Sequence, residues 1–436
     1  MAGTVTAYPS SAIAWRSTIV IFIVTAIAMA DRMAIAMLIG PIKRDFGIGD
    51  FQASLLVGAA FTSFYVLFLV PIGWAADRYS RPRVLGVCLL LWSLATITCG
   101  FATGFAMLFV LRMLVGGGEA GMAPCSHAII ADSFPPHALT KPMAMQGIGF
   151  QVGSAIGVAA AGAILAAGSA GAFAAWPLVG AFAPWRIALI LIGLPGIAGL
   201  ALIPLLHDPR KLHAPPTGSR ERLWPFMRDH AVLLALVLLL AGSSAMALGC
   251  VTAWVPEYVQ RVHGVPPFRT GAMLGTLLLV AAFAGQGLYA IISDWRSARG
   301  ATDAVLGVGL LPVALAVPAA WFAFGVTGAD RFFVALAVLL LCIAPCNAIV
   351  NTTVQLIAPP ALRSRLSAVA ILTISIIGFT LGPALVGALS QYVFGEAHLG
   401  TALQLIVTGA MALSFVLIVL LRPRLVRHVS TEGPRP

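Results

Sequence analysis

Twelve apolar runs, each about 20 residues or longer, constrain the fold of this chain more than any other feature of its sequence. An α-helix of about 20 apolar residues crosses the hydrocarbon core of a bilayer, and only helices or closed barrels satisfy their backbone hydrogen bonds there. The sequence therefore predicts an all-α integral membrane protein with twelve transmembrane helices. The runs lie near residues 17–40, 53–76, 84–102, 105–131, 142–168, 184–205, 231–259, 270–293, 301–324, 331–356, 365–393 and 399–421.

The composition excludes a soluble globular protein. The chain is 60% hydrophobic and 9% charged, whereas soluble domains average about 25% charged residues. Its formal net charge of +11 does not indicate nucleic acid as a partner, because the basic residues gather in short segments between apolar runs, where they set membrane topology. We expect no nucleic-acid partner.

The cysteines indicate neither a disulfide framework nor a metal site. All six lie inside apolar runs, and none has the spacing of metal ligands. We therefore expect no metal and no cofactor.

The basic residues predict the orientation of the chain. Under the twelve-helix topology, they are about three times as numerous on the side of the N-terminus as on the opposite side. This bias places both termini in the cytoplasm. The short termini and the lack of a targeting signal are typical of a multi-pass protein of a bacterial inner (plasma) membrane.

A polar connector divides the chain into two halves. Residues 207–229 are rich in proline and basic residues, and we expect a bundle of six helices on each side of them, at 1–206 and 230–436. A tripeptide at 123–125 recurs at 344–346, which indicates an internal repeat. Two six-helix bundles in pseudo-twofold parallel repeat are an architecture of transporters, whose substrate site lies between the halves near mid-membrane.

A cluster of charges follows the second apolar run. The pattern Gly73-x-x-x-Asp77-Arg78-x-x-Arg81 resembles the signature loop between the second and third helices of the major facilitator superfamily. Ser80 stands where that family usually has a second glycine. The resemblance implies the major facilitator fold and transport by alternating access.

Further motifs are similar to the Spinster branch of that superfamily. They are Asp31-Arg32, the segment 112–120 with its three consecutive glycines, and the segment 130–135. Residues 294–299 resemble a degenerate copy of the signature loop in the second half. The Spinster resemblance implies a lysophospholipid or a related amphiphile as the substrate, in some members with proton coupling.

Four ionisable residues lie well inside the predicted spans: Asp31, Arg32, Arg112 and Glu119. An ionised side chain there costs about 2.5 to 3.5 kcal/mol or more, so such residues normally face one another or a wet cavity. With about 1.5 Å of rise per residue, depth pairs Asp31 best with Arg112. Arg112 and Glu119 are seven residues apart and lie on one helical face.

We expect these four residues to couple protons to substrate. Glu119 is the candidate proton carrier, because desolvation and a nearby cation act on its carboxylate in opposite directions. Arg32 can pair with Glu119 when water leaves and with an anionic headgroup when substrate arrives. Because the two roles compete, binding of one species can eject the other. The alternative is a structural ion-pair network that fixes the packing of the first and fourth spans.

We expect Gly73, Asp77, Arg78 and Arg81 to form a cytoplasmic gate. In this hypothesis Asp77 meets a helix N-terminus or an arginine of the other half and stabilises the outward-open form. The alternative is that the arginines only anchor the topology through their positive charge.

Other polar residues inside the spans could line the cavity or form hydrogen bonds between helices. His127 could relay protons or could simply be a hydrogen-bonded core residue. Three glycines at 149, 153 and 157 predict a close-packing helix face. The remaining candidate cavity residues are Gln146, Gln151, Asn347, Asn351, Thr373 and Ser375.

The sequence thus predicts a monomeric secondary active transporter of a small, amphiphilic lysolipid-like substrate, with protons and membrane lipids as further partners. A proton-coupled transporter of drugs or small organic anions is the alternative. A channel or membrane enzyme is a third class, but the chain contains no Gly-Lys-Ser/Thr nucleotide loop, no His-Glu-x-x-His and no Gly-x-Ser-x-Gly motif. We therefore predict no enzymatic activity and no catalytic residues.

Overall fold

A computed structural model of the chain describes residues 8–135, 138–177, 179–208, 223–301, 303–359 and 362–432. Throughout these residues the ordered elements are helices, and no strand is present among them. Within the described part of the chain, twelve helices are long and apolar enough to cross a membrane, from Ser11–Phe46 to Glu396–His428. This result confirms the twelve predicted spans. Most of the predicted connector, residues 209–222, lies outside the described residues.

The chain forms two compact units. Unit 1 comprises Met1–Ile48, Ala59–Pro216 and Pro266–Gly275, and unit 2 comprises Gly49–Gly58, Thr217–Val265 and Thr276–Pro436. Each unit therefore includes the first part of a membrane span whose remainder belongs to the other unit. Division of the chain into bundles at 1–206 and 230–436 remains a proposal.

Unit 1 consists of helices from the first half of the sequence and the first part of α11. Its helices are α1 (Ser11–Phe46), α3 (Ala59–Arg78), α4 (Arg81–Cys99), α5 (Phe105–Glu119), α6 (Met122–Ser133), α7 (Thr140–Ser169), α8 (Pro184–Gly199) and the 3-10 helix η2 (Leu200–Leu205).

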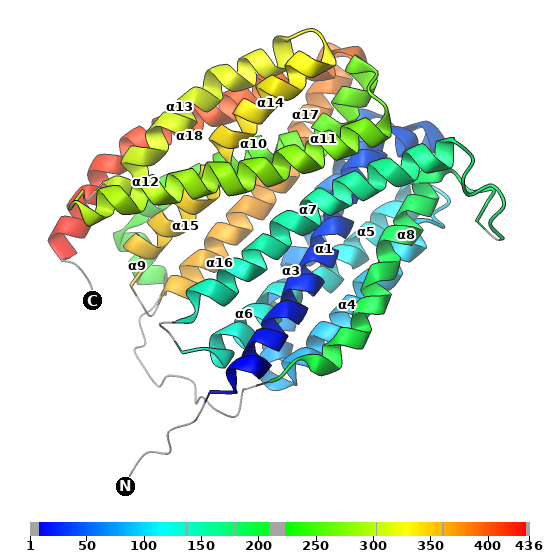
Figure 1. Cartoon of the computed structure of the whole chain (residues 1–436). Coiled ribbons are helices and arrows are strands. Elements are labelled where there is room, and N and C mark those ends of the chain that lie inside the picture. The colour runs from blue at the N-terminus through cyan, green and yellow to red at the C-terminus, as the bar shows by residue number, and fades with distance from the viewer. Residues whose placement is uncertain are drawn as a thin grey trace. The chain divides into compact units, whose positions relative to one another are not determined.

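Helix α7 packs closely against α1, beside which it lies in Figure 1. A Cβ atom added at Gly149, Gly153 or Gly157 would lie only 2.2 to 2.8 Å from a backbone carbonyl oxygen of α1. Only glycine allows the two backbones to approach this closely. The predicted close-packing face therefore exists, and its partner is the helix that carries Asp31 and Arg32.

Consecutive glycines let α5 pack between α3 and α4. A Cβ atom at Gly116 would lie 2.0 Å from the carbonyl oxygen of Phe61 on α3, and one at Gly118 would lie 2.8 Å from Trp92 on α4. The helix ends at Glu119 and α6 begins at Met122, so the fourth predicted span is two helices rather than one. The glycines thereby fix the position of α5, on which Arg112 and Glu119 lie.

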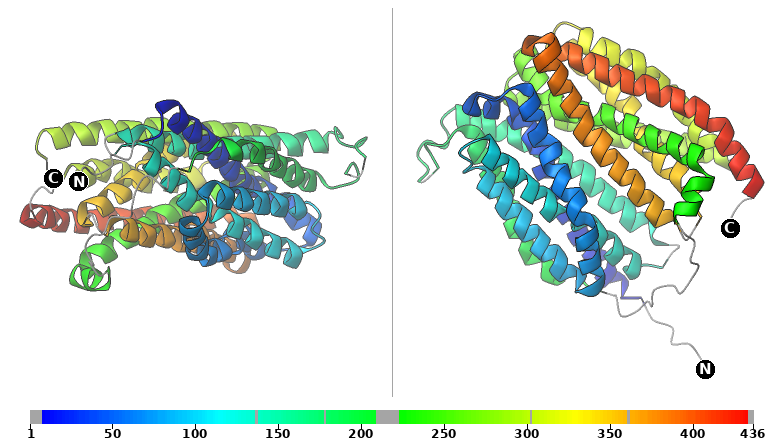
Figure 2. Two further views of the ribbon diagram at one scale, coloured as in Figure 1. Left: turned by 90° about the horizontal axis from the view of Figure 1, so that it is seen from below. Right: turned by 180° about the vertical axis from the view of Figure 1, so that it is seen from behind.

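Unit 2 holds α2, the remainder of α11 and the helices of the second half. In chain order they are α2 (Asp50–Val57), α9 (Leu223–Asp229), α10 (Ala231–His263), α11 (Pro267–Val280), η4 (Ala281–Gly285), α12 (Gln286–Ala298), α13 (Ala304–Gly325), α14 (Ala329–Ile343), α15 (Pro345–Ile357), α16 (Arg363–Thr373), η5 (Ile374–Leu381), α17 (Gly382–Ala388), η6 (Leu389–Phe394), η7 (Glu396–His398) and α18 (Leu399–Glu432). The long helix α18, red in Figure 2, packs beside α10 and α13.

Three segments of unit 2 are π-helical: η4, η5 and η6. Each interrupts a span that the sequence predicts as a continuous helix, since hydrophobic periodicity does not distinguish i→i+5 from i→i+4 hydrogen bonding. Segments of this kind are often found at functional sites.

Candidate functional site

Unit 1 brings the four predicted intramembrane charges together. Helix α1 supplies Asp31 and Arg32, and α5 supplies Arg112 and Glu119. Asp31, Arg112 and Glu119 are almost completely buried, whereas Arg32 is partly exposed. Two acidic and two basic groups make this cluster formally neutral, which reduces the cost of holding charge away from water.

Arg32 and Glu119 form the closest pair in the cluster. The guanidinium of Arg32 donates two hydrogen bonds to one carboxylate oxygen of Glu119, Oε2, from Nε at 3.1 Å and from Nη2 at 2.7 Å. The side chain of Arg32 is 25% exposed, whereas that of Glu119 is 1% exposed. The second carboxylate oxygen, Oε1, is buried and makes no hydrogen bond within the described part of the chain. The arginine can thus be reached by solvent or ligand, whereas the carboxylate lies beneath it.

Arg112 and Asp31 form a second, longer pair. Nη1 of Arg112 lies 3.8 Å from Oδ1 of Asp31, as their predicted depths in the membrane suggest. Among the described residues, none of the three guanidinium nitrogens of Arg112 makes a hydrogen bond. The other oxygen of Asp31 accepts a hydrogen bond of 2.5 Å from the hydroxyl of Thr96 on α4. Asp31 is thus held by α4, while Arg112 keeps all its donors available.

Two aromatic rings of α3 complete the surroundings of Arg32. The guanidinium carbon of Arg32 lies 4.2 Å from the ring centre of Phe61 and 5.4 Å from that of Tyr65. Contacts of this kind orient a cation and stabilise it by about 0.5 to 2 kcal/mol. No pattern in the sequence distinguishes Phe61, Tyr65 and Thr96, because aromatic and hydroxyl residues are ordinary in an apolar run.

Within the predicted gate motif, the structure assigns a clear contact to Arg81. Its Nη1 donates to Oδ2 of Asp132 on α6 at 2.5 Å, and its backbone N–H donates to Oδ2 of Asp208 at 3.1 Å. Asp77 and Arg78 are exposed, and the guanidinium of Arg78 lies 5.5 Å from the ring centre of Trp74. Arg81 thus ties the start of α4 to the end of α6 within unit 1.

Gly73 lies within α3. A Cβ atom there would meet nothing within 4 Å, so no steric constraint within the structure requires glycine at this position.

The predicted cavity residues divide between the two units. In unit 1, Gln146 is buried, Gln151 is half-buried and His127 is exposed. The break between α5 and α6 means that His127 and Glu119 are not on one continuous helix. The role of all three in a cavity remains a prediction.

In unit 2, the predicted cavity residues lie on the second-half helices. Asn347 and Asn351 are exposed on α15, where Nδ2 of Asn351 donates to Oδ1 of Asn347 at 2.9 Å. Thr373 and Ser375 are half-buried, and Thr373 donates to the carbonyl of Val369. Their exposure to a substrate also remains a prediction.

Unit 2 contains a buried charge cluster that no pattern in the sequence predicts. Asp50, at the start of α2, is completely buried and accepts hydrogen bonds from Nη1 and Nη2 of Arg261 at 2.9 and 2.8 Å. The hydroxyl of Ser390 donates to the same carboxylate at 2.6 Å. Arg261 also donates to Glu257, one turn earlier in α10, at 2.9 Å. The cluster fastens α2 to α10 and η6 within this unit.

The family model described as Major Facilitator Superfamily matches residues 21–383. This match covers most of the chain and includes both charge clusters of the first half. The chain belongs to the major facilitator superfamily. It is therefore an integral membrane transporter with the fold of that family.

Among its relatives, this family member resembles Spinster proteins. It is 27% identical to Protein spinster of Drosophila melanogaster over 404 residues, which are 88% of this chain and 63% of that protein. The chain thus spans less than two thirds of the length of that relative. It is also 25% identical to a protein named MFS-type efflux pump in Mycolicibacterium smegmatis over 435 residues, 96% of this chain and 95% of that protein.

A solved structure supports the same fold. The crystal structure of a bacterial homolog of the human lysosomal transporter Spinster, in an inward-facing and unoccupied conformation, matches with a TM-score of 0.81 and 23% sequence identity. The match covers 98% of this chain and 100% of that chain. These similarities confirm the predicted fold class and the predicted resemblance to Spinster proteins.

Proposed function

We propose that this protein is a proton-coupled secondary active transporter that moves a lysolipid-like amphiphile by alternating access. The observation that carries the proposal is the pairing of a partly exposed arginine, Arg32, with a buried carboxylate, Glu119. Alternating access itself is supported by the family to which the chain belongs.

The exposed guanidinium suits an anionic headgroup. Arg32 presents a planar fork of donors, and phosphate and carboxylate oxygens match this fork well. Phe61, which is buried, and Tyr65, which is half-buried, make the surroundings of the guanidinium apolar. An amphiphile with a phosphate headgroup satisfies both features, and the resemblance to Spinster proteins supports this substrate class.

Competition for Arg32 couples the proton to the headgroup. An anion that takes the donors of Arg32 leaves Glu119 ionised, buried and without its closest cation, which is costly. Uptake of a proton, held at either carboxylate oxygen, removes this cost. Protonation of Glu119 and binding of an anionic headgroup to Arg32 therefore favour each other, and the headgroup and the ionised carboxylate are the species that exclude each other.

Arg112 provides a second cation that can pair with an ionised carboxylate of the cluster. All its nitrogens are buried without hydrogen bonds in the described residues, and it lies on the same helix as Glu119. It can thus stabilise whichever carboxylate is ionised as the pairs rearrange. We propose Asp31, Arg32, Arg112 and Glu119 as the coupling residues.

The remaining residue assignments are also proposals. The family resemblance supports a gate at Gly73, Asp77, Arg78 and Arg81, and the basic residues support a cytoplasmic location for both termini in a bacterial inner membrane. Their position inside the spans supports a place in the cavity wall for the residues His127, Gln146, Gln151, Asn347, Asn351 and Thr373.

Counterflow in proteoliposomes tests the proposal. Purified protein is reconstituted, and exchange of radiolabelled lysophospholipid is measured with and without a pH gradient. We expect saturable exchange that responds to the gradient. In Glu119→Gln the side chain can neither gain nor lose a proton, so exchange at equal pH should persist while the response to the gradient disappears.

A matched control is Asp229→Asn, which removes an exposed carboxylate from the end of α9. This variant should keep both exchange and its pH response. If Glu119→Gln transports normally and still follows the pH gradient, Glu119 does not carry the proton. Gradient-driven conductance without saturation would instead indicate a channel.

A transporter of drugs or small organic anions is the second candidate. The similarity to a protein named MFS-type efflux pump, over nearly the full length of both chains, favours it. Competition in the same counterflow assay separates the two candidates. Inhibition by lysolipids at concentrations at which drugs and organic acids have no effect supports the lysolipid, and the reverse order supports the alternative.

A further inference from the structure

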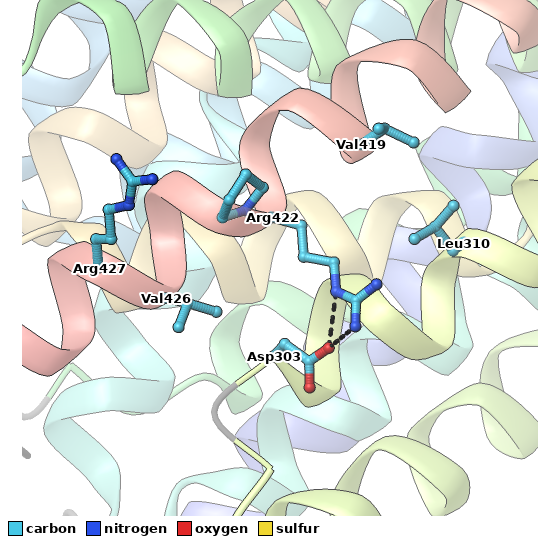
Figure 3. Close-up of a pocket in the computed structure, with 7 residues that line it drawn as sticks. Asp303, Leu310, Val419, Arg422, Val426 and Arg427 are labelled. Atoms are coloured by element: carbon cyan, nitrogen blue, oxygen red, sulfur yellow. Dashed lines mark hydrogen bonds and ion pairs between the residues drawn. The ribbon is translucent and has the colours of Figure 1, made fainter.

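Unit 2 contains a pocket far from the coupling residues in the sequence. It lies between the start of α13 and the end of α18 and has a volume of about 610 Å³. Leu310 of α13 and Val419 and Val426 of α18 form its apolar wall, and Arg422 and Asp303 meet at its base (Figure 3). A volume of this size suits a small organic group.

The polar end of the pocket has an excess of positive charge. Arg422 donates from Nε to Oδ2 of Asp303 at 2.7 Å and forms an ion pair with the same oxygen through Nη2. A third group, Arg296 of α12, lies 3.6 Å from the other oxygen of Asp303. Arg427 also lines the pocket, five residues further along α18. Two guanidinium groups thus pair with the carboxylate of Asp303, and Arg427 adds a further positive charge to the lining.

Arg422 remains reachable despite its ion pair. Its side chain is 45% exposed, whereas that of Asp303 is 15% exposed. Its pairing with Asp303 positions the guanidinium at the pocket while leaving donors for another acceptor, since a guanidinium has five N–H groups. An anion can therefore bind to Arg422 without displacing Asp303.

The helices that form the pocket present apolar side chains outward. Leu311 and Leu315 of α13 are 66% and 50% exposed, and Val416 and Leu420 of α18 are 49% and 44% exposed. In a transmembrane helix, exposed aliphatic residues indicate contact with lipid chains. The pocket therefore joins a basic end to a surface that suits an acyl chain.

The ends of the spans place this pocket at headgroup level. Trp295 is 53% exposed at the end of α12, and the guanidinium carbon of Arg299 lies 3.6 Å from the centre of its ring. Exposed tryptophan next to arginine is typical of the boundary between hydrocarbon and water. The bias of basic residues puts this end on the cytoplasmic side, where anionic lipids are enriched in many membranes.

We propose that this pocket binds an anionic phospholipid of the surrounding bilayer. The phosphate lies against Arg422 and Arg427, and an acyl chain follows the aliphatic surface of α13 and α18. The pocket shares no residue with the proposed coupling residues of unit 1, and its occupant is a resident lipid rather than transported substrate.

Native mass spectrometry of the full-length protein in detergent tests the proposal. The protein is titrated with phosphatidylglycerol, phosphatidylcholine and glycerol 1-phosphate. We expect phosphatidylglycerol to bind about tenfold more tightly than phosphatidylcholine, and glycerol 1-phosphate not to bind measurably. Equal binding of the two lipids would overturn the charge argument, and binding of glycerol 1-phosphate alone would identify the site as one for free phosphate esters.

Variants at the pocket provide the second arm. Arg422→Gln and Arg427→Gln should each weaken phosphatidylglycerol binding about tenfold, as expected for loss of a charge-assisted hydrogen bond. Arg424→Gln is the matched control, because Arg424 lies on the same helix but donates to the carbonyl of Leu420 in its own helix. An equal loss in Arg424→Gln would show non-specific attraction of lipid and overturn the proposal.

A third variant addresses the pocket without changing any charge. Leu310→Trp places a larger side chain in the pocket and should also weaken binding of phosphatidylglycerol. This variant decides the question if the arginine variants do not fold, which size-exclusion chromatography of each purified variant reports. Unchanged phosphatidylglycerol binding in Leu310→Trp would exclude the pocket as the site.

Discussion

Asp50 and Arg261 form an ion pair, but replacing the arginine should lower the stability of unit 2 more than replacing the aspartate. Arg261→Met removes the guanidinium that donates to both Asp50 and Glu257, whose side chains are 0% and 8% exposed. Asp50→Asn removes only one charge and leaves Arg261 paired with Glu257. Loss of the arginine should therefore destabilise unit 2 more than loss of the carboxylate.

The magnitude follows from the contacts. Loss of one partner of a buried ion pair costs about 3 to 5 kcal/mol, and Arg261→Met belongs at the upper end because two carboxylates lose the same cation. Asparagine at position 50 can still accept one hydrogen bond from Arg261, so Asp50→Asn should cost about 1.5 to 3 kcal/mol, the value of one charged hydrogen bond. We expect a difference of about 2 kcal/mol between the two variants.

Unfolding in mixed micelles of a mild detergent and SDS measures this difference. Tryptophan fluorescence follows the unfolding and gives its free energy for each variant. The double variant Asp50→Asn with Arg261→Met should be more stable than Arg261→Met alone, because it removes one of the two unpaired charges. Arg44→Met, at an exposed position near the end of α1, is the control and should change stability by less than about 0.5 kcal/mol. An Arg261→Met variant no less stable than Asp50→Asn would refute the reasoning.

Two further predictions concern unit 1, and the same unfolding assay checks both. Thr96→Val removes the hydroxyl that donates to Asp31 and should destabilise the protein by about 1 to 3 kcal/mol. The control Thr98→Val, at an exposed position on the same helix, should have little effect on stability. Equal losses of stability in the two variants would contradict the role of Thr96. Gly153→Leu places a side chain against the backbone of α1 and should cost about 3 kcal/mol, whereas Gly147→Leu, where a Cβ meets nothing within 4 Å, should be tolerated.

The twelve spans were predictable because the length and hydrophobicity of a run are local properties of the sequence. A segment that crosses about 30 Å of hydrocarbon has few alternatives to a helix. The structure extends the first span from the predicted 17–40 to Ser11–Phe46, because polar residues at helix ends continue the helix beyond the hydrocarbon. Hydropathy alone does not mark such ends.

The pairing of the four intramembrane charges was predictable because ionisable residues in hydrocarbon must find partners. Helical rise was sufficient to pair Asp31 with Arg112 in depth. The shorter contact between Arg32 and Glu119 depends on the rotation of α1 and α5 about their axes, which the glycines of α5 and α7 fix through packing. Sequence periodicity contains no information about that rotation between two different helices.

The cluster at Asp50 was not predictable for a different reason. Asp50 and Arg261 are separated by 211 residues, and Asp50 and Ser390 by 340. Asp50 and Arg261 both lie just outside the predicted apolar runs, at 53–76 and 231–259, where charged residues are expected to be in water. The burial of Asp50 results from the packing of α2 against α17 and η6 within unit 2, which no local pattern reports.

The boundary between the two units cuts two membrane crossings, after Gly58 and after Gly275. At these two points the chain passes between the units through backbone inside the bilayer, where no water replaces a broken hydrogen bond. Gly58 ends α2 with its own N–H still bonded to Ser54 at 3.0 Å, and α11 continues into the π-helical η4, where the bonding shifts to another carbonyl without being lost. At both cuts the backbone therefore keeps its hydrogen bonds, and the chain passes from one unit into the other without exposing an unpaired N–H group to hydrocarbon.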